Sequence, residues 1–302
     1  MYAVLGGIYG ALLSVMNLFN AQLSAVYGNW GSTVMIHAVG LLVLLPLAFT
    51  WGRPKGHAPW YLYGGGLIGI VTVTCCNLAI GGIGVTANLV IMLLGQLTCS
   101  TLIDQFGLFG ARQVKLSAAR LVSLLVIAAG DLVMLLWAGS SAGEGNTSTL
   151  LAVLTSFLSG FSMVFARISN ARLAEKSGLG FSTVMNYVTG LAGSFLIFAC
   201  MGLHLETAFP APGQSITIYL GGAMGALAIF LCNMVTPKLS TLQFTVILFV
   251  GQIFASMLLD ALLLGTFSMG TLVGGLIVAV GMALNTRAEA KEAKLLGDAH
   301  QS

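Results

Sequence analysis

The sequence is a succession of apolar runs, each about 20 residues long and therefore long enough to cross a bilayer as a helix. Only 7% of the residues are charged, compared with about 25% in a soluble globular domain. Strands of a membrane β-barrel would alternate polar and apolar residues, and these runs do not. The sequence therefore predicts an all-α polytopic membrane protein embedded in the lipid bilayer.

The apolar runs and the loops between them predict ten transmembrane helices. They lie near residues 3–25, 31–50, 60–80, 86–104, 118–138, 149–171, 181–202, 216–236, 240–260 and 269–286. With ten spans, all Lys and Arg residues fall toward one side of the membrane together with both termini, and the opposite loops carry only Glu144 and Glu206. Because cytoplasmic loops are rich in Lys and Arg, we predict that both termini are cytoplasmic. The same positive charge is explained by topology and gives no indication of nucleic-acid binding.

The two halves of the chain repeat one another. FNAQLSAVYGNWGSTVMIHAVGLL resembles SNARLAEKSGLGFSTVMNYVTGLA at an offset of 150 residues, and residues 63–104 match 219–260 without gaps at an offset of 156. Each repeat has an odd number of spans, so the second is predicted to be inverted relative to the first. Inverted repeats are typical of secondary transporters, whose substrate site lies near the bilayer midplane between the halves.

These features predict four segments along the chain. They are a first five-helix repeat (1–139), a periplasmic linker (140–149), a second, inverted five-helix repeat (150–286) and a cytoplasmic tail (287–302).

Three motifs resemble the YdcZ-like family of the drug/metabolite transporter superfamily. They are N-x-x-L-S in the first span, W-Y-L-Y-G-G-G-L-I-G at the start of the third, and G-Q-L-T-C-S-T-L-I-D at the end of the fourth. The resemblance implies a fused, two-repeat member that acts as a ten-helix inner-membrane transporter, with the fifth helix of each half at the periphery. The family often has a Gln six residues after the Gly of span one, whereas Met16 and Ala166 stand at the two equivalent positions here.

Gln96 and Gln252 are the first candidate substrate-binding residues. Each follows a glycine within an apolar run, and the two are equivalent in the repeat. A buried amide at this depth is costly unless it is hydrogen-bonded. The pair would therefore bind a polar substrate at the midplane or form interhelical hydrogen bonds that hold the repeats together.

Asn77 and Asn233 form a second equivalent pair, about two-thirds along spans three and eight. Glycines near the start of each span allow close helix packing, which would place these amides at helix contacts or facing a cavity. Asp104 and Asp260 end spans four and nine, where we predict structural roles.

Asp131 is the acidic residue deepest in a predicted span, and its equivalent in the second half is Met282. An ionisable residue inside the membrane is a functional candidate. Asp131 would serve as a counter-ion to a cationic substrate or as the carrier of a coupled proton, although the repeat does not require it.

Two further positions differ between the halves. Arg167, equivalent to Asn17, would either bind a carboxylate or phosphate or extend its charge to the cytoplasmic membrane surface. His37, equivalent to Tyr187, is expected to be a hydrogen-bonded structural residue. Asn17 and Tyr187 are included among the candidate substrate-binding residues, and the ring of Tyr187 would stack on a substrate or face lipid.

The sequence contains no P-loop motif and no cluster of histidines, so we predict neither ATP hydrolysis nor an enzymatic activity, and no cofactor or metal. The predicted function is secondary active transport of a small polar organic metabolite or organic cation across the bacterial inner membrane, by a monomer or homodimer. Coupling would be to a proton or another ion. The alternative is a non-transporting membrane protein, such as a lipid scramblase or structural partner. Export of toxic compounds and import of metabolites both remain open.

Overall fold

The computed structural model describes residues 1–51, 53–111, 113–138, 148–210, 213–259, 261–262 and 268–299. Within these ranges the chain is helical and contains no strand, which confirms the predicted all-α fold. The long helices are α1 (Tyr2–Trp51), α2 (Gly65–Phe106), α3 (Ala118–Ala138), α4 (Thr149–Ser177), α5 (Leu179–Cys200), α6 (Leu220–Val235), α7 (Thr241–Leu259) and α8 (Met269–Ala299). Short 3-10 helices are η1 (Trp60–Gly64), η2 (Leu108–Gly110), η3 (Ile216–Tyr219) and η4 (Thr236–Lys238).

Nine helical segments of the described chain are long and apolar enough to cross a membrane. The first, Tyr2–Pro46, has 45 residues, more than twice the roughly 20 that one crossing requires. It contains a non-helical residue, Gly28, with φ 73° and ψ 166°. Counting the segments on either side of this break separately gives the ten predicted spans.

The break at Gly28 has a counterpart in the second half. Gly178 has φ 100° and ψ 147°, and it separates α4 from α5. Both residues have a positive φ, which costs little for glycine because it has no Cβ. Gly28 and Gly178 are equivalent in the sequence repeat, so the first span of each half ends at an equivalent glycine.

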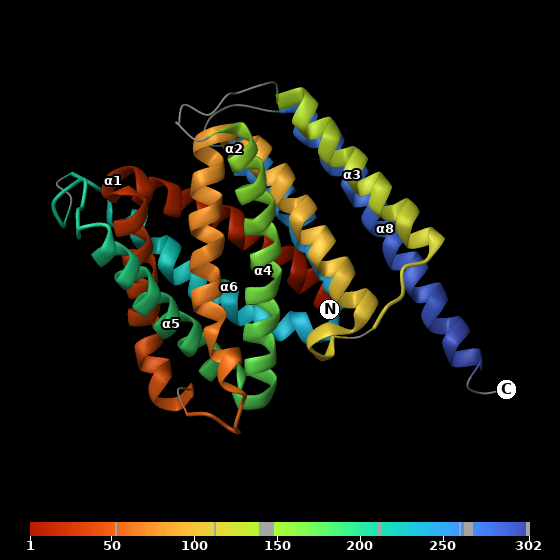
Figure 1. Ribbon diagram of the computed structural model, residues 1–302, viewed down its shortest axis with the longest axis horizontal. Helices are drawn as coiled ribbons and strands as arrows, with labels where there is room; N and C mark the ends of the chain where they lie inside the picture. The colour runs from red at the N-terminus through yellow and green to blue at the C-terminus, as the bar shows by residue number, and fades with distance from the viewer. Residues whose placement is uncertain are drawn as a thin grey trace.

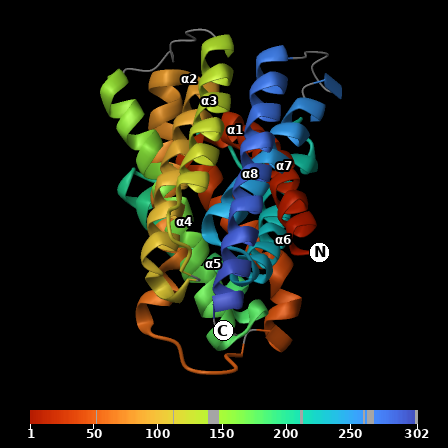
Figure 2. The same cartoon turned by 90° about the vertical axis from the view of Figure 1, so that its right-hand side faces the viewer.

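The helices form a bundle in which each half packs against the other (Figure 1). Helix α1 packs on α6 and α7, whereas α2 packs along α4. The last helices of the two halves, α3 and α8, lie side by side at the edge of the bundle (Figure 1). Figure 2 shows the helices standing roughly along one direction, as membrane spans do.

Close glycine contacts are exchanged between the halves in matching pairs. A Cβ on Gly10 of α1 would lie 1.9 Å from the carbonyl oxygen of Leu248 on α7. A Cβ on Gly160 of α4 would lie 1.9 Å from the carbonyl oxygen of Met92 on α2. Gly10 is equivalent to Gly160 and Met92 to Leu248, so the same helix crossing occurs twice with the halves exchanged. This exchange indicates an approximate two-fold relation between the halves.

His37 and Tyr187 mark where the two-fold axis passes. These residues are equivalent in the repeat, and their rings contact each other with centroids 5.7 Å apart. Two equivalent residues can touch only if they lie close to the axis. Each ring also fills the space beside a glycine of the other half, with His37 beside Gly190 and Tyr187 beside Gly40.

One end of the bundle carries the basic loops, and we call it the basic end. Lys55 lies against Gly178 there, and Arg172 lies against Gly110. The loop that follows α1 is at this end, at the bottom of Figures 1 and 2.

A buried polar network joins α2, α3, α7 and α8 toward the basic end. Both carboxylate oxygens of Asp104 accept hydrogen bonds from the first turn of α7, from Thr241 N at 2.9 Å and Leu242 N at 3.0 Å. Arg120 forms ion pairs with Asp104 at 3.5 Å and with Glu289 at 3.3 Å. Asp104 has the structural role predicted for it, while Asp260 lies outside the described residues.

The predicted division of the chain into four segments stays a prediction. Most of the predicted linker lies outside the described residues, which resume at residue 148. There Ser148 caps α4, its Oγ accepting a hydrogen bond from Leu151 N. Helix α8 continues to Ala299, so it includes most of the segment predicted as a tail.

Candidate functional site

Arg167 lies deep within the bundle on α4. The span that was predicted to end near residue 171 continues to Ser177, because the helix break falls at Gly178. Arg167 is therefore about 15 Å from the end of the helix, at 1.5 Å per residue. Only 4% of the residue is exposed. The expectation that its charge extends to the membrane surface is wrong.

The guanidinium of Arg167 is held by α7 on one side and leaves donors unused on the other. Nη2 donates a hydrogen bond to Thr245 Oγ1 at 2.5 Å, and Cζ lies 4.9 Å from the centre of the Phe244 ring. Nε and Nη1 have no hydrogen-bond partner among the described residues. A buried donor without a partner costs about 1–3 kcal/mol, and a charged one costs more.

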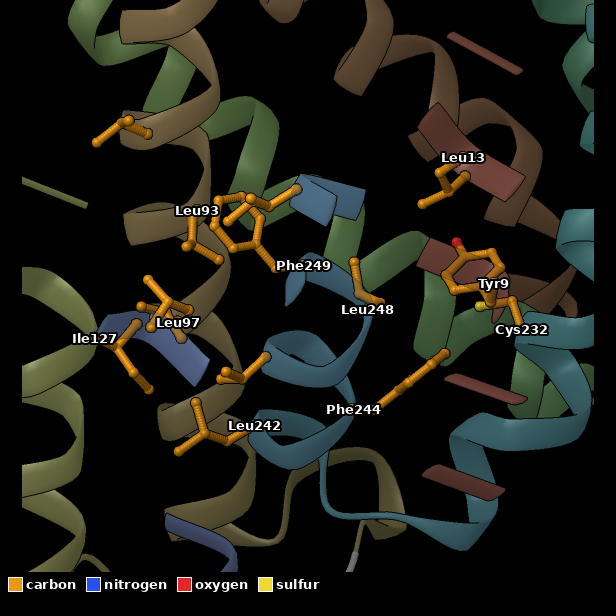
Figure 3. Close-up of a cluster of buried hydrophobic side chains, with 14 of the residues drawn as sticks. Tyr9, Leu13, Leu93, Leu97, Ile127, Cys232, Leu242, Phe244, Leu248 and Phe249 are labelled. Carbon is orange, nitrogen blue, oxygen red and sulfur yellow. The ribbon is translucent and has the colours of Figure 1, made fainter. Parts of the chain in front are cut away.

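Neutral polar and aromatic groups surround this charge. Tyr9 on α1, Cys99 on α2 and Cys232 on α6 are within its electrostatic range. Figure 3 shows Tyr9, Cys232 and Phe244 close together on three different helices. Thr245 is also hydrogen-bonded to Ser100 of α2 at 2.8 Å. We call the set Tyr9, Cys99, Ser100, Arg167, Cys232, Phe244 and Thr245 the Arg167 cluster.

No carboxylate neutralises Arg167 in the described part of the chain. The three ion pairs found there involve Arg120 and Arg172 instead. Among the described residues, Asp104 is the only acidic one with an electrostatic effect on Arg167. Its two oxygens are already bonded to the backbone of α7, and it is paired with Arg120. Arg167 is thus a buried positive charge without a counter-ion of its own among the residues that the structure describes.

A small hollow opens beside the Arg167 cluster toward the basic end. Its volume is about 40 Å³, and its lining includes Ala171 of α4 and Thr241 of α7. These two residues stand one helical turn from Arg167 and Thr245, respectively. The exposed ion pair of Arg172 with Glu175 lies at its rim. The hollow therefore lies about one helical turn from the Arg167 cluster, on the side of the basic end.

A larger hollow of about 570 Å³ lies elsewhere, between α1, η3 and α6. Its walls are mostly apolar, with Val43, Ile216 and Leu220 among them. None of the candidate residues predicted from the sequence lines it.

The two predicted glutamines occupy matching places. Gln96 is 1% exposed and Gln252 is 7% exposed. A Cβ on Gly160 would lie 3.0 Å from Gln96 N, and one on Gly10 would lie 2.9 Å from Gln252 N. Oε1 of Gln96 has no partner among the described residues, and Gln96 is one helical turn from Ser100 of the Arg167 cluster. Both amides are therefore buried where the halves meet.

Asn233 and Tyr187 are engaged in contacts within the second half. Asn233 Nδ2 lies 3.3 Å from Ser182 Oγ, while its Oδ1 has no partner in the described structure. The hydroxyl of Tyr187 donates to the carbonyl of Gly222 at 3.2 Å. The side chain of Asn77 lies outside the described part of the chain.

His37 is bonded within its own helix, as expected for a structural residue. Its Nδ1 lies 2.8 Å from the carbonyl oxygen of Thr33, one turn earlier.

Asp131 and Asn17 do not join the Arg167 cluster. Asp131 is 1% exposed on α3, and neither carboxylate oxygen has a partner among the described residues. It follows Gly130, where a Cβ would lie 2.7 Å from the carbonyl oxygen of Gly274 on α8. Asn17, the equivalent of Arg167, has an exposed side chain.

Most of the Arg167 cluster was not predicted from the sequence. Tyr9, Phe244 and Thr245 come from two helices distant from Arg167 in the chain, and each is an ordinary residue of an apolar span. The available signal was Arg167 itself, because a charge within a span requires polar neighbours.

Two halves that exchange contacts around buried polar groups in a bundle of apolar helices are an arrangement that many membrane transporters share. A family model described as "Putative inner membrane exporter, YdcZ" matches residues 1–133 and 151–288. The chain belongs to this family, which confirms the resemblance noted in the sequence. It is a multi-pass protein of a family of transporters rather than enzymes.

A comparison with solved structures finds a protein of similar fold. A solved structure described as "Crystal structure of protein" superposes with a TM-score of 0.74, covering 96% of this chain and 98% of that chain. The sequence identity is 17%, so this similarity concerns the fold alone. A comparison with curated proteins finds no match.

Proposed function

We propose that the protein is a secondary transporter that exports a small polar organic solute across the bacterial inner membrane by alternating access. The observation that carries this proposal is the exchange of matching contacts between the halves. Gly10 of α1 packs against α7, and its equivalent Gly160 of α4 packs against α2. Because the halves are inverted repeats, each can adopt the packing of the other. The protein then has two conformations that are built from equivalent contacts. A solute bound where the halves meet would face one side of the membrane in each conformation.

The solute site in this proposal lies around Gln96, Gln252 and the Arg167 cluster. These residues are buried, come from both halves, and include polar atoms without partners within the described structure. Asp131 is the candidate for coupling to a proton. The larger hollow does not support the alternative of a lipid-handling protein. A path for lipid headgroups would need polar walls, and the walls of this hollow are mostly apolar.

The basic end is cytoplasmic in this proposal, because cytoplasmic loops carry the excess of Lys and Arg. Lys55 is exposed in a loop beside Gly178, and Glu206 is exposed in a loop beside Gly28. These two glycines end the first spans of opposite halves. In a cysteine-free background, a membrane-impermeant maleimide added to intact cells is expected to label Glu206→Cys but not Lys55→Cys. Labelling of Lys55→Cys before the cells are permeabilised would contradict the orientation.

The double substitution Gln96→Leu with Gln252→Leu is expected to abolish solute exchange while the protein still folds. Both amides are buried at the contact between the halves, and Leu keeps a similar volume without hydrogen-bonding groups. The measurement is counterflow in proteoliposomes with labelled amino acids, nucleosides, sugars, organic acids and organic cations. Wild-type protein should exchange one of these classes saturably.

Gln243→Leu is the matched control, because Gln243 lies on α7 with Gln252 but is only partly buried, near the start of the helix. Exchange should survive in this variant. If the wild type exchanges no solute but accelerates flipping of a fluorescent phospholipid, the transport proposal fails and the lipid-scramblase alternative replaces it. If the double variant exchanges solute like the wild type, the glutamines are scaffold.

A further inference from the structure

We propose that Arg167 is the anion-binding residue of the solute site and that the transported solute carries a single negative charge, as a carboxylate does. This inference rests on the proposed transport function and specifies its substrate class. It begins from the state of the guanidinium, which is 4% exposed and has no acidic partner in the described chain. A buried charge without a partner is strongly unfavourable, so a structural role would be better served by a neutral residue.

The unused donors give the ligand its chemistry. Nη2 of Arg167 is bonded to Thr245, whereas Nε and Nη1 are without partners in the described structure. Guanidinium donors form their strongest hydrogen bonds with carboxylate and phosphate oxygens. The Phe244 ring lies against the guanidinium and the Thr245 hydroxyl holds it, so its orientation is fixed before a ligand arrives.

The surroundings select one negative charge rather than two. Apart from Arg167, the cluster consists of hydroxyl, thiol and aromatic side chains, namely Tyr9, Cys99, Ser100, Cys232, Phe244 and Thr245. Asn17, at the equivalent position in the other half, is neutral and exposed. One guanidinium balances a carboxylate, whereas a phosphate dianion would leave a buried negative charge uncompensated. A cationic solute would meet repulsion from Arg167.

The route to the guanidinium comes from the basic end. Ala171 and Thr241 line the hollow of about 40 Å³ and lie one turn from Arg167 and Thr245. This volume accommodates little more than a small polar group, so the hollow is too small in this conformation to admit a whole solute. A solute from the basic end would require α4 and α7 to separate at Ala171 and Thr241, which is the movement that opens a transporter toward the cytoplasm.

Matched solutes of different charge test this inference. Benzoate, benzamide and benzylamine have similar size and carry one negative, no, and one positive charge at neutral pH, as do butyrate, butyramide and butylamine. Thermal unfolding of the purified full chain is measured with each compound. We expect stabilisation by the carboxylates alone, because a ligand stabilises the state that it binds.

Arg167→Gln is expected to weaken carboxylate binding by about tenfold or more, as the loss of a charged hydrogen bond does. Arg167→Lys should retain part of the effect. Arg287→Gln is the matched control, since Arg287 is an exposed arginine of α8 that lines neither hollow, and it should bind carboxylates like the wild type. Without ligand, Arg167→Gln should unfold at a higher temperature than the wild type, which a purely structural arginine would not allow.

Several results would overturn the inference. One is stabilisation by the amides or amines that equals that by the carboxylates, and another is an undiminished carboxylate effect in Arg167→Gln. Counterflow of the same compounds separates this inference from the transport proposal. Exchange of only the amines or amides leaves transport standing and removes the anion site. Carboxylate binding without exchange of any compound leaves the anion site standing and removes transport.

Discussion

Replacing Asp104 with alanine is expected to destabilise the protein by about 3–5 kcal/mol, the usual cost of removing one partner from a buried ion pair. Asp104 is fully buried, and three groups depend on its carboxylate. Two are the backbone N–H groups of Thr241 and Leu242 at the start of α7, which have no acceptor within their own helix. The third is Arg120, itself 1% exposed, which would retain only Glu289 as an acidic partner.

Thermal unfolding of the purified variant in detergent measures this loss. Glu175→Ala is the matched control, since it removes the same kind of ion pair, with Arg172, at an exposed position. Its cost should stay below about 1 kcal/mol, as for other surface pairs. If Asp104→Ala and Glu175→Ala lose equal stability, Asp104 is not the anchor of α7.

Replacing Asp131 with leucine is expected to stabilise the protein by about 1–3 kcal/mol, the cost of a buried polar group without a partner. The branched end of Leu copies the shape of the carboxyl group, so the exchange alters polarity more than packing. Around Asp131, Ile127, Met134 and Val278 form an apolar layer between α3 and α8. The equivalent position in the second half is already apolar, since it holds Met282.

The same variant separates the two interpretations of Asp131. If the carboxyl group carries a coupled proton, Asp131→Leu gains stability but its solute exchange no longer responds to an imposed pH gradient. If Asp131 has no part in coupling, the variant gains stability and the response persists. Asp131→Asn, which keeps an unsatisfied polar group of the same shape, should gain less stability. A loss of stability in Asp131→Leu would contradict the assignment of an unpartnered carboxyl group.

The number of spans and the equivalence of the two halves could be predicted because both appear as patterns in the sequence. Apolar length defines the spans, and the repeat identifies equivalent residues such as Gly28 and Gly178. The sequence did not place the end of α4 correctly, because residues 172–177 are polar enough to resemble a loop but continue the helix until Gly178. That difference moved Arg167 from the predicted membrane surface to the interior.

The site was less predictable because its residues meet through helix packing. Gln96 and Gln252 were identified by their repetition, and the structure buries both. Repetition gave no indication of the Arg167 cluster, whose central residue has a different type and a different exposure in the other half. Equivalence between the halves therefore predicted the residues that both halves share. It could not predict the buried charge of Arg167, because the halves differ at that position.

The contact between His37 and Tyr187 shows what a single chain permits that a pair of identical chains does not. Two separate copies of one half would bring identical rings together on the axis, and they would bring either two arginines or none to the depth of Arg167. Covalent joining lets each position evolve independently of its counterpart. The protein can thus combine a His with a Tyr at its centre and confine one positive charge to one side of it. A nearly symmetric bundle of helices thereby carries an asymmetric distribution of charge.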